Sequence, residues 1–411
     1  MQLVFRAYAE LGITKFDNVL DMSTSQGYTQ DIPATIQQGR RMSTFKTYAN
    51  RVAQKQRPNL HIIKNARVTK IRINERTNQV QGVDFVWRNL YKMKAKISKE
   101  VIVSAGTMNS PQLLMLSGIG DSEHLASLSI PLIKHLPVGN NLQDHGMLPL
   151  WLSFAEDITL DESVGDPEAA FDYLLHRHGP WGSMLSLMAF VKTQPLLHDN
   201  YANLQLVSHT ILPKGSKTTF EFLGFKPEIV EAIFSQTRDQ NTLQILGSLL
   251  QPSSRGKVRL RSSNPWDTLD IYNSYAETLS DQQVLLFYIR FVQQMLKTQS
   301  FRNYGLELIH VYLEKCSNFI ANSDAFWLCY IRHFFISAWH PAGTCRMGPA
   351  TSNDSVVDSR LRVHGVRGLR VVDASIMPKI TSGNTNGPTI MIAEKAADII
   401  RQDWSQSKNF S

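Results

Sequence analysis

Three neighbouring motifs carry the strongest pattern of the chain: WHPAGTCRMG (Trp339–Gly348), LRVVDASIMP (Leu369–Pro378) and SGNTNGPTIMIAEKAAD (Ser382–Asp398). The first is a polar loop, the second predicts a short apolar strand stopped by an acidic residue, and the third is a Gly/Asn-rich turn that leads into a helix. Pro388 suits the first position of that helix, where its missing N–H does no harm. The free N–H groups of a helix start favour negative charge, so this region has the layout of a site.

Length and composition indicate a globular protein of more than one domain. The chain has 411 residues, of which 43% are hydrophobic and 19% charged, so a sizeable core is easily built. The formal net charge is +8, but the basic residues are spread along the chain and no basic block is interleaved with aromatic residues. We therefore interpret the charge as a solvated surface and expect no nucleic-acid partner.

Neither a membrane span nor a metal site is expected. No run of about 18 apolar residues occurs, and the opening MQLVFRAYAELGI predicts an amphipathic helix rather than a signal peptide. Cys316, Cys329 and Cys345 lack the spacing of metal ligands, and their odd number predicts no disulfide framework.

The first third of the chain predicts helix and loop followed by strands. A loop over 17–39 and a helix ending near Lys55 are expected after the N-terminal helix, and Ser110-Pro111 predicts the start of a helix that ends at Gly118. Runs rich in β-branched residues predict strands over Leu60–Ile63, Ala66–Ile73, Val80–Trp87 and Glu100–Ala105.

Residues 146–335 predict a second domain inserted between two pieces of the first, which are residues 1–145 and 336–411. Helices are expected over Glu168–Arg177, Lys226–Thr237 and Asp281–Lys297, and strands over Lys257–Arg261 and Leu269–Tyr272.

The motifs resemble those of the glucose-methanol-choline (GMC) flavoprotein oxidoreductases, closest to the insect glucose-dehydrogenase-like branch. Besides the three opening motifs, the matching blocks are SAGTMNSPQLLMLSGIG (Ser104–Gly120), PVGNNLQDH (Pro137–His145) and SRGKVRLRSSNPWDTLDI (Ser254–Ile271). The resemblance implies an α/β fold class: an FAD-binding, Rossmann-like domain (1–145 and 336–411) with an inserted sheet-and-helix substrate domain (146–335).

One feature of that family is absent from this sequence. Family members carry GxGxxG on a strand-to-helix turn that cradles the FAD pyrophosphate, and no such string occurs here; Gly118-Ile119-Gly120 breaks at the third position. The family's first signature is missing as well. We therefore expect an incomplete FAD-binding domain, an open edge on the strand Val101–Ala105, weak FAD binding and poor solubility of the isolated chain.

The resemblance implies that hydride passes from an alcohol to flavin N5 while a protein base removes the hydroxyl proton. His340 is the expected base because its ordinary pKa lies near neutrality, and Asn384 is expected to hydrogen-bond the substrate oxygen. A lone histidine is more often a surface or core residue, and Asn384 is alternatively a turn residue that tolerates left-handed geometry.

Cofactor contacts also follow from the resemblance. Asn386, Pro388 and Thr389 are expected to face the flavin's pyrimidine edge, Asp373 the phosphate–ribitol region and Val68 the adenine, with Trp339 and Ala374 alongside. The alternative for the last helix is simple packing through Ile390, Ala393, Ala397 and Ile400.

The sequence thus predicts an FAD-dependent oxidoreductase acting on the CH–OH group of an alcohol or sugar. A truncated, inactive fragment or an interaction module is the alternative, favoured by the missing nucleotide-binding turn. Oxygen and a quinone both stay open as electron acceptor. The localisation is not encoded in a leader here, and the insect branch implies secretion.

Overall fold

The computed structural model describes residues 2–16, 26–30, 34–50, 57–155, 167–182, 187–193, 201–211 and 216–406. They belong to two compact units, each built from three segments of the chain. The first unit comprises Met1–Gln56, His145–Ser253 and Ala276–Ala338, and the second comprises Arg57–Asp144, Ser254–Tyr275 and Trp339–Ser411.

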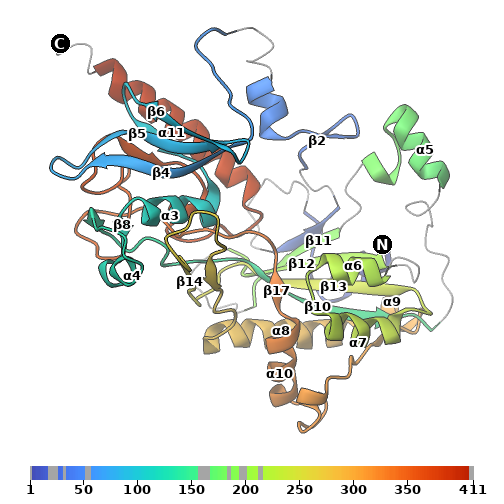
Figure 1. The fold of residues 1–411 in the computed structure, drawn as a ribbon. Coiled ribbons are helices and arrows are strands. Elements are labelled where there is room, and N and C mark those ends of the chain that lie inside the picture. The colour runs from blue at the N-terminus through green and yellow to red at the C-terminus, as the bar shows by residue number, and fades with distance from the viewer. Residues whose placement is uncertain are drawn as a thin grey trace. The chain divides into compact units, whose positions relative to one another are not determined.

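The first unit is organised around a seven-stranded antiparallel sheet in the order β1-β11-β12-β13-β10-β16, with β17 also pairing with β10 (Figure 1). Every residue of the central strand β13 is buried, which is expected of a strand covered on both faces. Gly247 of this strand makes room for the ring of Tyr288, because a Cβ there would lie 2.6 Å from it. The strands are β1 (Gly27–Thr29), β10 (Gly146–Ser153), β11 (Leu187–Val191), β12 (Leu204–Ile211), β13 (Thr242–Leu249), β16 (Glu307–Leu308) and β17 (Ile336–Ser337).

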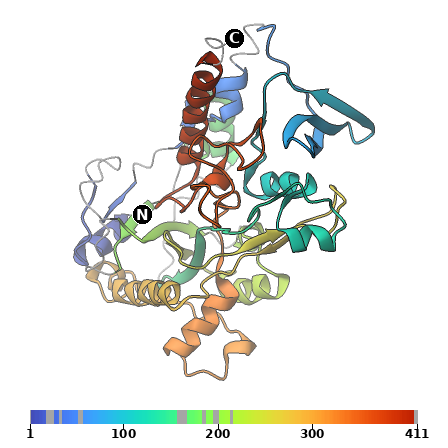
Figure 2. The same cartoon turned by 90° about the vertical axis from the view of Figure 1, so that its left-hand side faces the viewer.

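Helices cover this sheet. The predicted periodicity of α8 is confirmed, since Val284, Leu285, Tyr288 and Val292 are buried, and α10 packs against α8 (Figure 2). The described helices of the unit are α1 (Gln2–Glu10), α5 (Pro167–His176), α6 (Ser216–Phe222), α7 (Pro227–Thr237), α8 (Leu279–Met295), α9 (Gln299–Arg302) and α10 (Asp324–Phe334). Shorter elements are β2 (Ile36–Gln37), β3 (Arg40–Arg41), the π-helix Phe45–Ala49 and the 3-10 helices Pro180–Gly182 and Glu314–Cys316.

A disulfide joins Cys316 to Cys329 of α10, with Cα atoms 5.8 Å apart. The expectation that an odd cysteine count gives no disulfide was therefore wrong: two of the three cysteines pair, and Cys345 alone is free and buried. Sequence spacing could not show this pair, because the chain doubles back between the two residues and only the fold brings them together.

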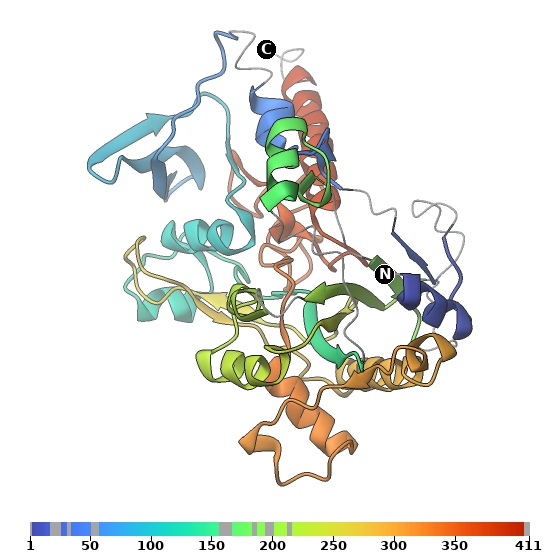
Figure 3. The same cartoon turned by 90° about the vertical axis from the view of Figure 1, so that its right-hand side faces the viewer.

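The second unit contains the antiparallel sheet of β4 (Ala66–Asn74), β5 (Gln79–Trp87) and β6 (Tyr91–Lys96). A separate parallel pair of strands, β7 (Val101–Val103) and β18 (Leu369–Val371), joins segments of this unit that are far apart in the sequence. The hairpin of β14 (Lys257–Arg259) and β15 (Asp270–Tyr272) packs beside α3 (Gly106–Leu116), as Figure 3 shows. The remaining elements are β8 (Ile119–Gly120), β9 (Lys134–His135), α4 (Ser122–Ser127), the turn η6 (Ala374–Ile376) and α11 (Asn386–Gln406).

Several local predictions in this unit were wrong. Residues 60–63 form no strand, and Leu60, Ile62 and Ile63 are exposed. Helix α11 buries Ile392 and Ala396, whereas Ala393 and Ala397 of the predicted face are exposed. The buried positions are shifted by one residue from the predicted face, and the helix begins at Asn386 rather than at Pro388.

Helix α3 begins at Gly106 and not at Ser110-Pro111 as expected, so Pro111 lies inside it. Since proline has no N–H, the carbonyl of Thr107 one turn earlier has no helical donor. That carbonyl instead accepts the hydroxyl of Thr344 at 2.6 Å. Pro111 therefore leaves the carbonyl of Thr107 available to Thr344, a residue of the polar loop Trp339–Gly348.

The expected α/β fold class is confirmed, but the compact units do not follow the predicted domain boundaries. Residues 1–56 belong to the unit that contains most of 146–335, and residues 254–275 belong to the other unit. Pairing of β18 with β7 explains how the C-terminal and earlier segments build one body.

Candidate active site

The loop that begins at Trp339 is fastened to the second unit along its whole length. The backbones of Gln143 and Ala342 exchange hydrogen bonds of 3.0 and 2.8 Å, and the N–H of Gly139 donates to the carbonyl of Thr344. On the other side, the N–H of Cys345 donates to the carbonyl of Ser375 at 2.8 Å. A loop with so many fixed backbone groups holds its side chains in defined positions.

His340 occupies the start of this loop. Its side chain is half-buried, and its backbone N–H donates to Asp144 Oδ1 at 2.9 Å. Burial lowers the pKa of the imidazole below its ordinary 6.5, and the negative charge of Asp144 offsets part of this by raising the pKa. The imidazole is therefore neutral at neutral pH and able to accept a proton.

Asn384 lies next to that imidazole, as expected. Its Nδ2 is 3.3 Å from His340 Nε2, a contact at the long end of the hydrogen-bond range. The Asn384 side chain is exposed, so a small molecule can reach the pair. The fold thus brings together the two predicted catalytic residues, which are distant in sequence.

Helix α11 starts two residues after Asn384. Asn386 and Gly387 of its first turn are exposed, and a Cβ added at Gly387 would meet nothing within 4 Å. Thr389 is half-buried and its hydroxyl donates to the carbonyl of Thr385 at 2.7 Å, while Pro388 is half-buried in the same turn. The first N–H groups of a helix have no helical acceptor, so this open end favours an anionic group.

Trp339 adopts a left-handed backbone conformation with φ of +56° and is 56% exposed. Such a conformation is unfavourable for a bulky residue and recurs at functional sites. It turns the chain immediately before His340.

Asp373 directs its carboxylate into the protein. Oδ2 accepts the N–H of Gly106 at 2.9 Å and the hydroxyl of Ser110 at 2.5 Å, and Oδ1 accepts the N–H of Ser375 at 2.8 Å. The residue therefore ties the start of α3 to the end of β18. The carbonyl of Ala374, which follows it, accepts the N–H of Gly343 at 3.2 Å.

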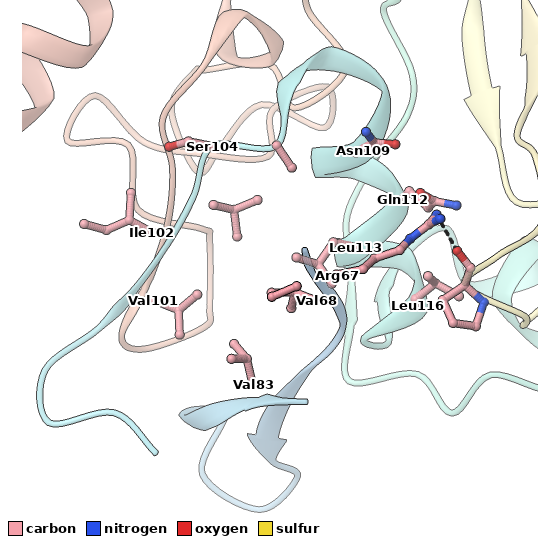
Figure 4. A pocket seen from close by; sticks show the side chains of 14 residues that line it. Arg67, Val68, Val83, Val101, Ile102, Ser104, Asn109, Gln112, Leu113 and Leu116 are labelled. Atoms are coloured by element: carbon pink, nitrogen blue, oxygen red, sulfur yellow. Dashed lines mark hydrogen bonds between the residues drawn. The ribbon is translucent and has the colours of Figure 1, made fainter. Parts of the chain in front are cut away.

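Val68 lines an open pocket of about 660 Å³ between β4, β7 and α3 (Figure 4). Val68 and Ile102 are 40% and 44% exposed there, which is high for large apolar side chains. Arg67 is held at the rim by a 2.6 Å hydrogen bond to the carbonyl of Pro265. The pocket lining includes neither His340 nor Asn384, so the candidate proton acceptor and this apolar pocket are separate features of one unit.

Gln143 and Asp144 belong to the turn-rich block Pro137–His145, in which no sequence pattern marks either residue as functional. The structure shows that both contact the loop of His340, and that Asp144 also accepts the phenol of Tyr275 at 2.5 Å. In the sequence Asp144 is only an acidic residue in a loop, and loops have no periodicity that would single it out.

The sequence model of the GMC oxidoreductase family matches residues 1–147 and 252–393. A glucose dehydrogenase (FAD, quinone) of Drosophila pseudoobscura pseudoobscura is 34% identical over 98% of this chain and 62% of its own length. An ecdysone oxidase of Bombyx mori is 36% identical over 98% of this chain and 58% of its own length. The chain thus spans about 60% of these relatives.

Among solved structures, an FAD-dependent oxidoreductase from Chaetomium thermophilum superposes with a TM-score of 0.78 at 25% identity. The match covers 98% of this chain and 72% of that one.

Proposed function

Because the chain belongs to the GMC oxidoreductase family, we propose that it is an FAD-dependent oxidoreductase that oxidises the CH–OH group of a small alcohol or sugar. The observation that carries the proposal is the contact between His340 and Asn384, with 3.3 Å between Nε2 and Nδ2, beside the open start of α11. An inactive fragment has no need of this pairing.

His340 acts as the general base. With a pKa below 6.5 its imidazole is neutral near pH 7, so Nε2 can take the hydroxyl proton of the alcohol. Asn384 Nδ2 donates to the alcohol oxygen and keeps it oriented toward Nε2. The long contact between Asn384 Nδ2 and His340 Nε2 can be replaced by an alcohol hydroxyl, because a hydroxyl accepts one hydrogen bond and donates another.

The residues present fit an FAD in two places. The exposed apolar side chains of Val68 and Ile102 offer walls for the adenine ring, and the open turn at Asn386 and Gly387 offers N–H donors for a ring that gains negative charge. When bound, FAD supplies the ring that accepts the hydride at N5.

Further contacts to that cofactor are proposed for residues bordering these places. Pro388 and Thr389 shape the start of α11, and Trp339 precedes the proposed base. Since the carboxylate of Asp373 is already bonded within the protein, we assign it and Ala374 a contact through the backbone.

The name of one relative, glucose dehydrogenase (FAD, quinone), supports a sugar or related alcohol as substrate and a quinone as electron acceptor, with oxygen as the alternative acceptor. The disulfide between Cys316 and Cys329 supports a secreted protein, because such bonds persist in oxidising compartments. In the part of the chain that the structure describes, no helix combines the length and apolar character needed to cross a bilayer.

The test is anaerobic reduction of the FAD-loaded protein by a panel of alcohols and sugars. Bleaching of the flavin's visible absorbance measures the reduction. His340→Ala should slow reduction by about two orders of magnitude or more without changing the bound flavin's spectrum. His61→Ala, which removes an exposed histidine of the same unit that the proposal does not use, serves as control. Unchanged reduction by the His340 variant would reject the proposal.

A further inference from the structure

The loop Pro137–Asp144 is part of a motif to which the proposed reaction assigns no role, yet it runs along the whole base-bearing loop. Backbone hydrogen bonds connect Gly139 to Thr344 at 2.9 Å and Gln143 to Ala342 at 3.0 and 2.8 Å. At the end of this ladder, Asp144 Oδ1 accepts the N–H of His340 at 2.9 Å.

Gln143 extends the same support to the other half of the pair. Its side chain is buried, its Nε2 donates to the carbonyl of Pro378 at 3.3 Å, and its Oε1 accepts the N–H of Ile380 at 3.1 Å. Ile380 precedes Asn384 by four residues on the same segment. One short loop therefore fixes the backbone of both proposed catalytic segments.

The carboxylate of Asp144 is itself held on both sides. While Oδ1 accepts the His340 N–H, Oδ2 accepts the hydroxyl of Tyr275 at 2.5 Å. Two donors on opposite oxygens fix the plane of the carboxylate. The negative charge is thus kept beside His340 in a defined orientation.

We propose that Asp144 is a positioning residue for His340: it fixes the base through the backbone and holds a negative charge next to the imidazole. The catalytic part of this proposal rests on the function proposed above, in which His340 is the general base. The Asp144 carboxylate is the charge that acts on this imidazole. The Asn384 amide, which contacts Nε2, carries no charge.

The charge has a measurable consequence. The Asp144 carboxylate raises the pKa of His340 against the lowering caused by burial. Replacing Asp144 with Asn keeps the size and a carbonyl acceptor for the His340 N–H but removes the charge. The pKa of His340 should therefore fall in Asp144→Asn, whereas a purely structural role would leave it in place.

The experiment is hydrogen–deuterium exchange at the imidazole C2–H, read by mass spectrometry for each histidine over a pH series in the full chain. It needs neither cofactor nor turnover. In Asp144→Asn the His340 midpoint should move to lower pH. An unchanged midpoint in a variant with wild-type circular dichroism would overturn the proposal.

Two variants serve as controls. Asp121 caps α4 by accepting the N–H of His124 at 2.9 Å. Burial lowers the pKa of that histidine and the charge of Asp121 offsets part of this, so Asp121 repeats the arrangement elsewhere. Asp121→Asn should lower the midpoint of His124 and leave His340 unchanged. Tyr275→Phe keeps the Asp144 charge and should not lower the His340 midpoint. If the midpoint falls as far as in Asp144→Asn, the effect comes from the lost hydrogen bond, and the proposed role of the charge is contradicted.

Activity distinguishes this proposal from the function itself. In the flavin-loaded enzyme, Asp144→Ala should reduce kcat/KM by about 10- to 100-fold through misplacement of the base. Asp144→Asn should in addition shift the acid limb of the kcat/KM profile to lower pH. If His340→Ala retains full activity while the exchange midpoint still shifts in Asp144→Asn, the catalytic role fails and the contact between Asp144 and His340 stands.

Discussion

Arg370 of β18 and Glu100, which immediately precedes β7, form an ion pair in which each side chain is about 95% buried, with Nε 2.6 Å from Oε2. Further bonds satisfy both groups: Trp404 Nε1 donates to Glu100 at 2.6 Å, and Arg370 also donates to Asp403 at 2.8 Å. Trp404 and Asp403 both lie on α11. The pair therefore connects the parallel strands to the helix whose other end carries the proposed site.

Removing one partner of this pair should destabilise the second unit strongly. Arg370→Met leaves the Glu100 carboxylate buried with too few donors, and such changes cost about 3–5 kcal/mol. Urea unfolding followed by circular dichroism measures the loss. The exposed pair of Arg401 and Asp398 gives the control, since Arg401→Met should leave the midpoint unchanged.

The double variant Arg370→Met/Glu100→Leu sharpens this test. With both charges gone no buried charge is left unpaired, so the double variant should be more stable than Arg370→Met alone. Equal or greater loss in the double variant would show that packing rather than the charge pair dominates.

The disulfide is the second stability prediction. Cys316 and Cys329 are 13 residues apart in sequence, and closing a loop of this size stabilises a fold by about 3 kcal/mol in the chain-entropy model. A reducing agent should therefore lower the melting temperature by several degrees. The variant Cys316→Ser/Cys329→Ser should melt at the lower temperature and lose its response to the reducing agent; a wild-type chain unaffected by reductant would contradict the bond.

The pH dependence follows from the lowered pKa of His340. The reactive form is the neutral imidazole, so kcat/KM of the flavin-loaded enzyme should be constant at neutral pH and fall only as the pH drops through the His340 pKa. Because burial places that pKa below 6.5, the acid limb should have its midpoint below 6.5. A limb centred above pH 7 would mean that another group controls the reaction.

The same shift bears on stability. The unfolded chain binds a proton at His340 more readily than the folded chain, so this residue stabilises the fold fully above the unfolded pKa, and the contribution is lost as the pH falls below it. Acid therefore acts on activity and stability in the same direction at this residue.

Local periodicity was enough to predict several of the regular elements. The apolar spacing of α8 identified its buried face, and β-branched runs located β4 and β5, because these signals depend on near neighbours in sequence. The same reasoning placed a strand at Leu60–Ile63 and missed β6, Tyr91–Lys96, whose sequence YKMKAK is mostly polar. An exposed edge strand is paired by its backbone, which no side-chain pattern reveals.

The site was predictable only in part. The motifs supplied His340 and Asn384, and the fold places them in contact. The roles of Gln143, Asp144 and Pro111 could not be read from the sequence, because each depends on contacts with backbone groups of segments distant in sequence. Such contacts depend on the register of two loops, which neither composition nor periodicity encodes.

Gly343 offers a last test of the loop that supports His340. Its φ of +92° is unfavourable for any residue with a Cβ, and a Cβ there would lie 2.6 Å from the carbonyl of Asn141 and 2.8 Å from Gln143 Nε2. Gly343→Ala must therefore push the base-bearing loop away from Pro137–Asp144, at a cost of about 2–3 kcal/mol or more.

Gly12 separates the two causes of that cost. Its φ of +78° carries similar backbone strain, but a Cβ there would meet nothing within 4 Å. Gly12→Ala should cost only about 1 kcal/mol and leave the C2–H exchange midpoint of His340 unchanged. Gly343→Ala should cost more, and because it loosens the contact with Asp144, it should also lower the His340 midpoint. If both alanine variants lose the same stability and neither moves that midpoint, the two loops are not coupled in the way the hydrogen bonds indicate.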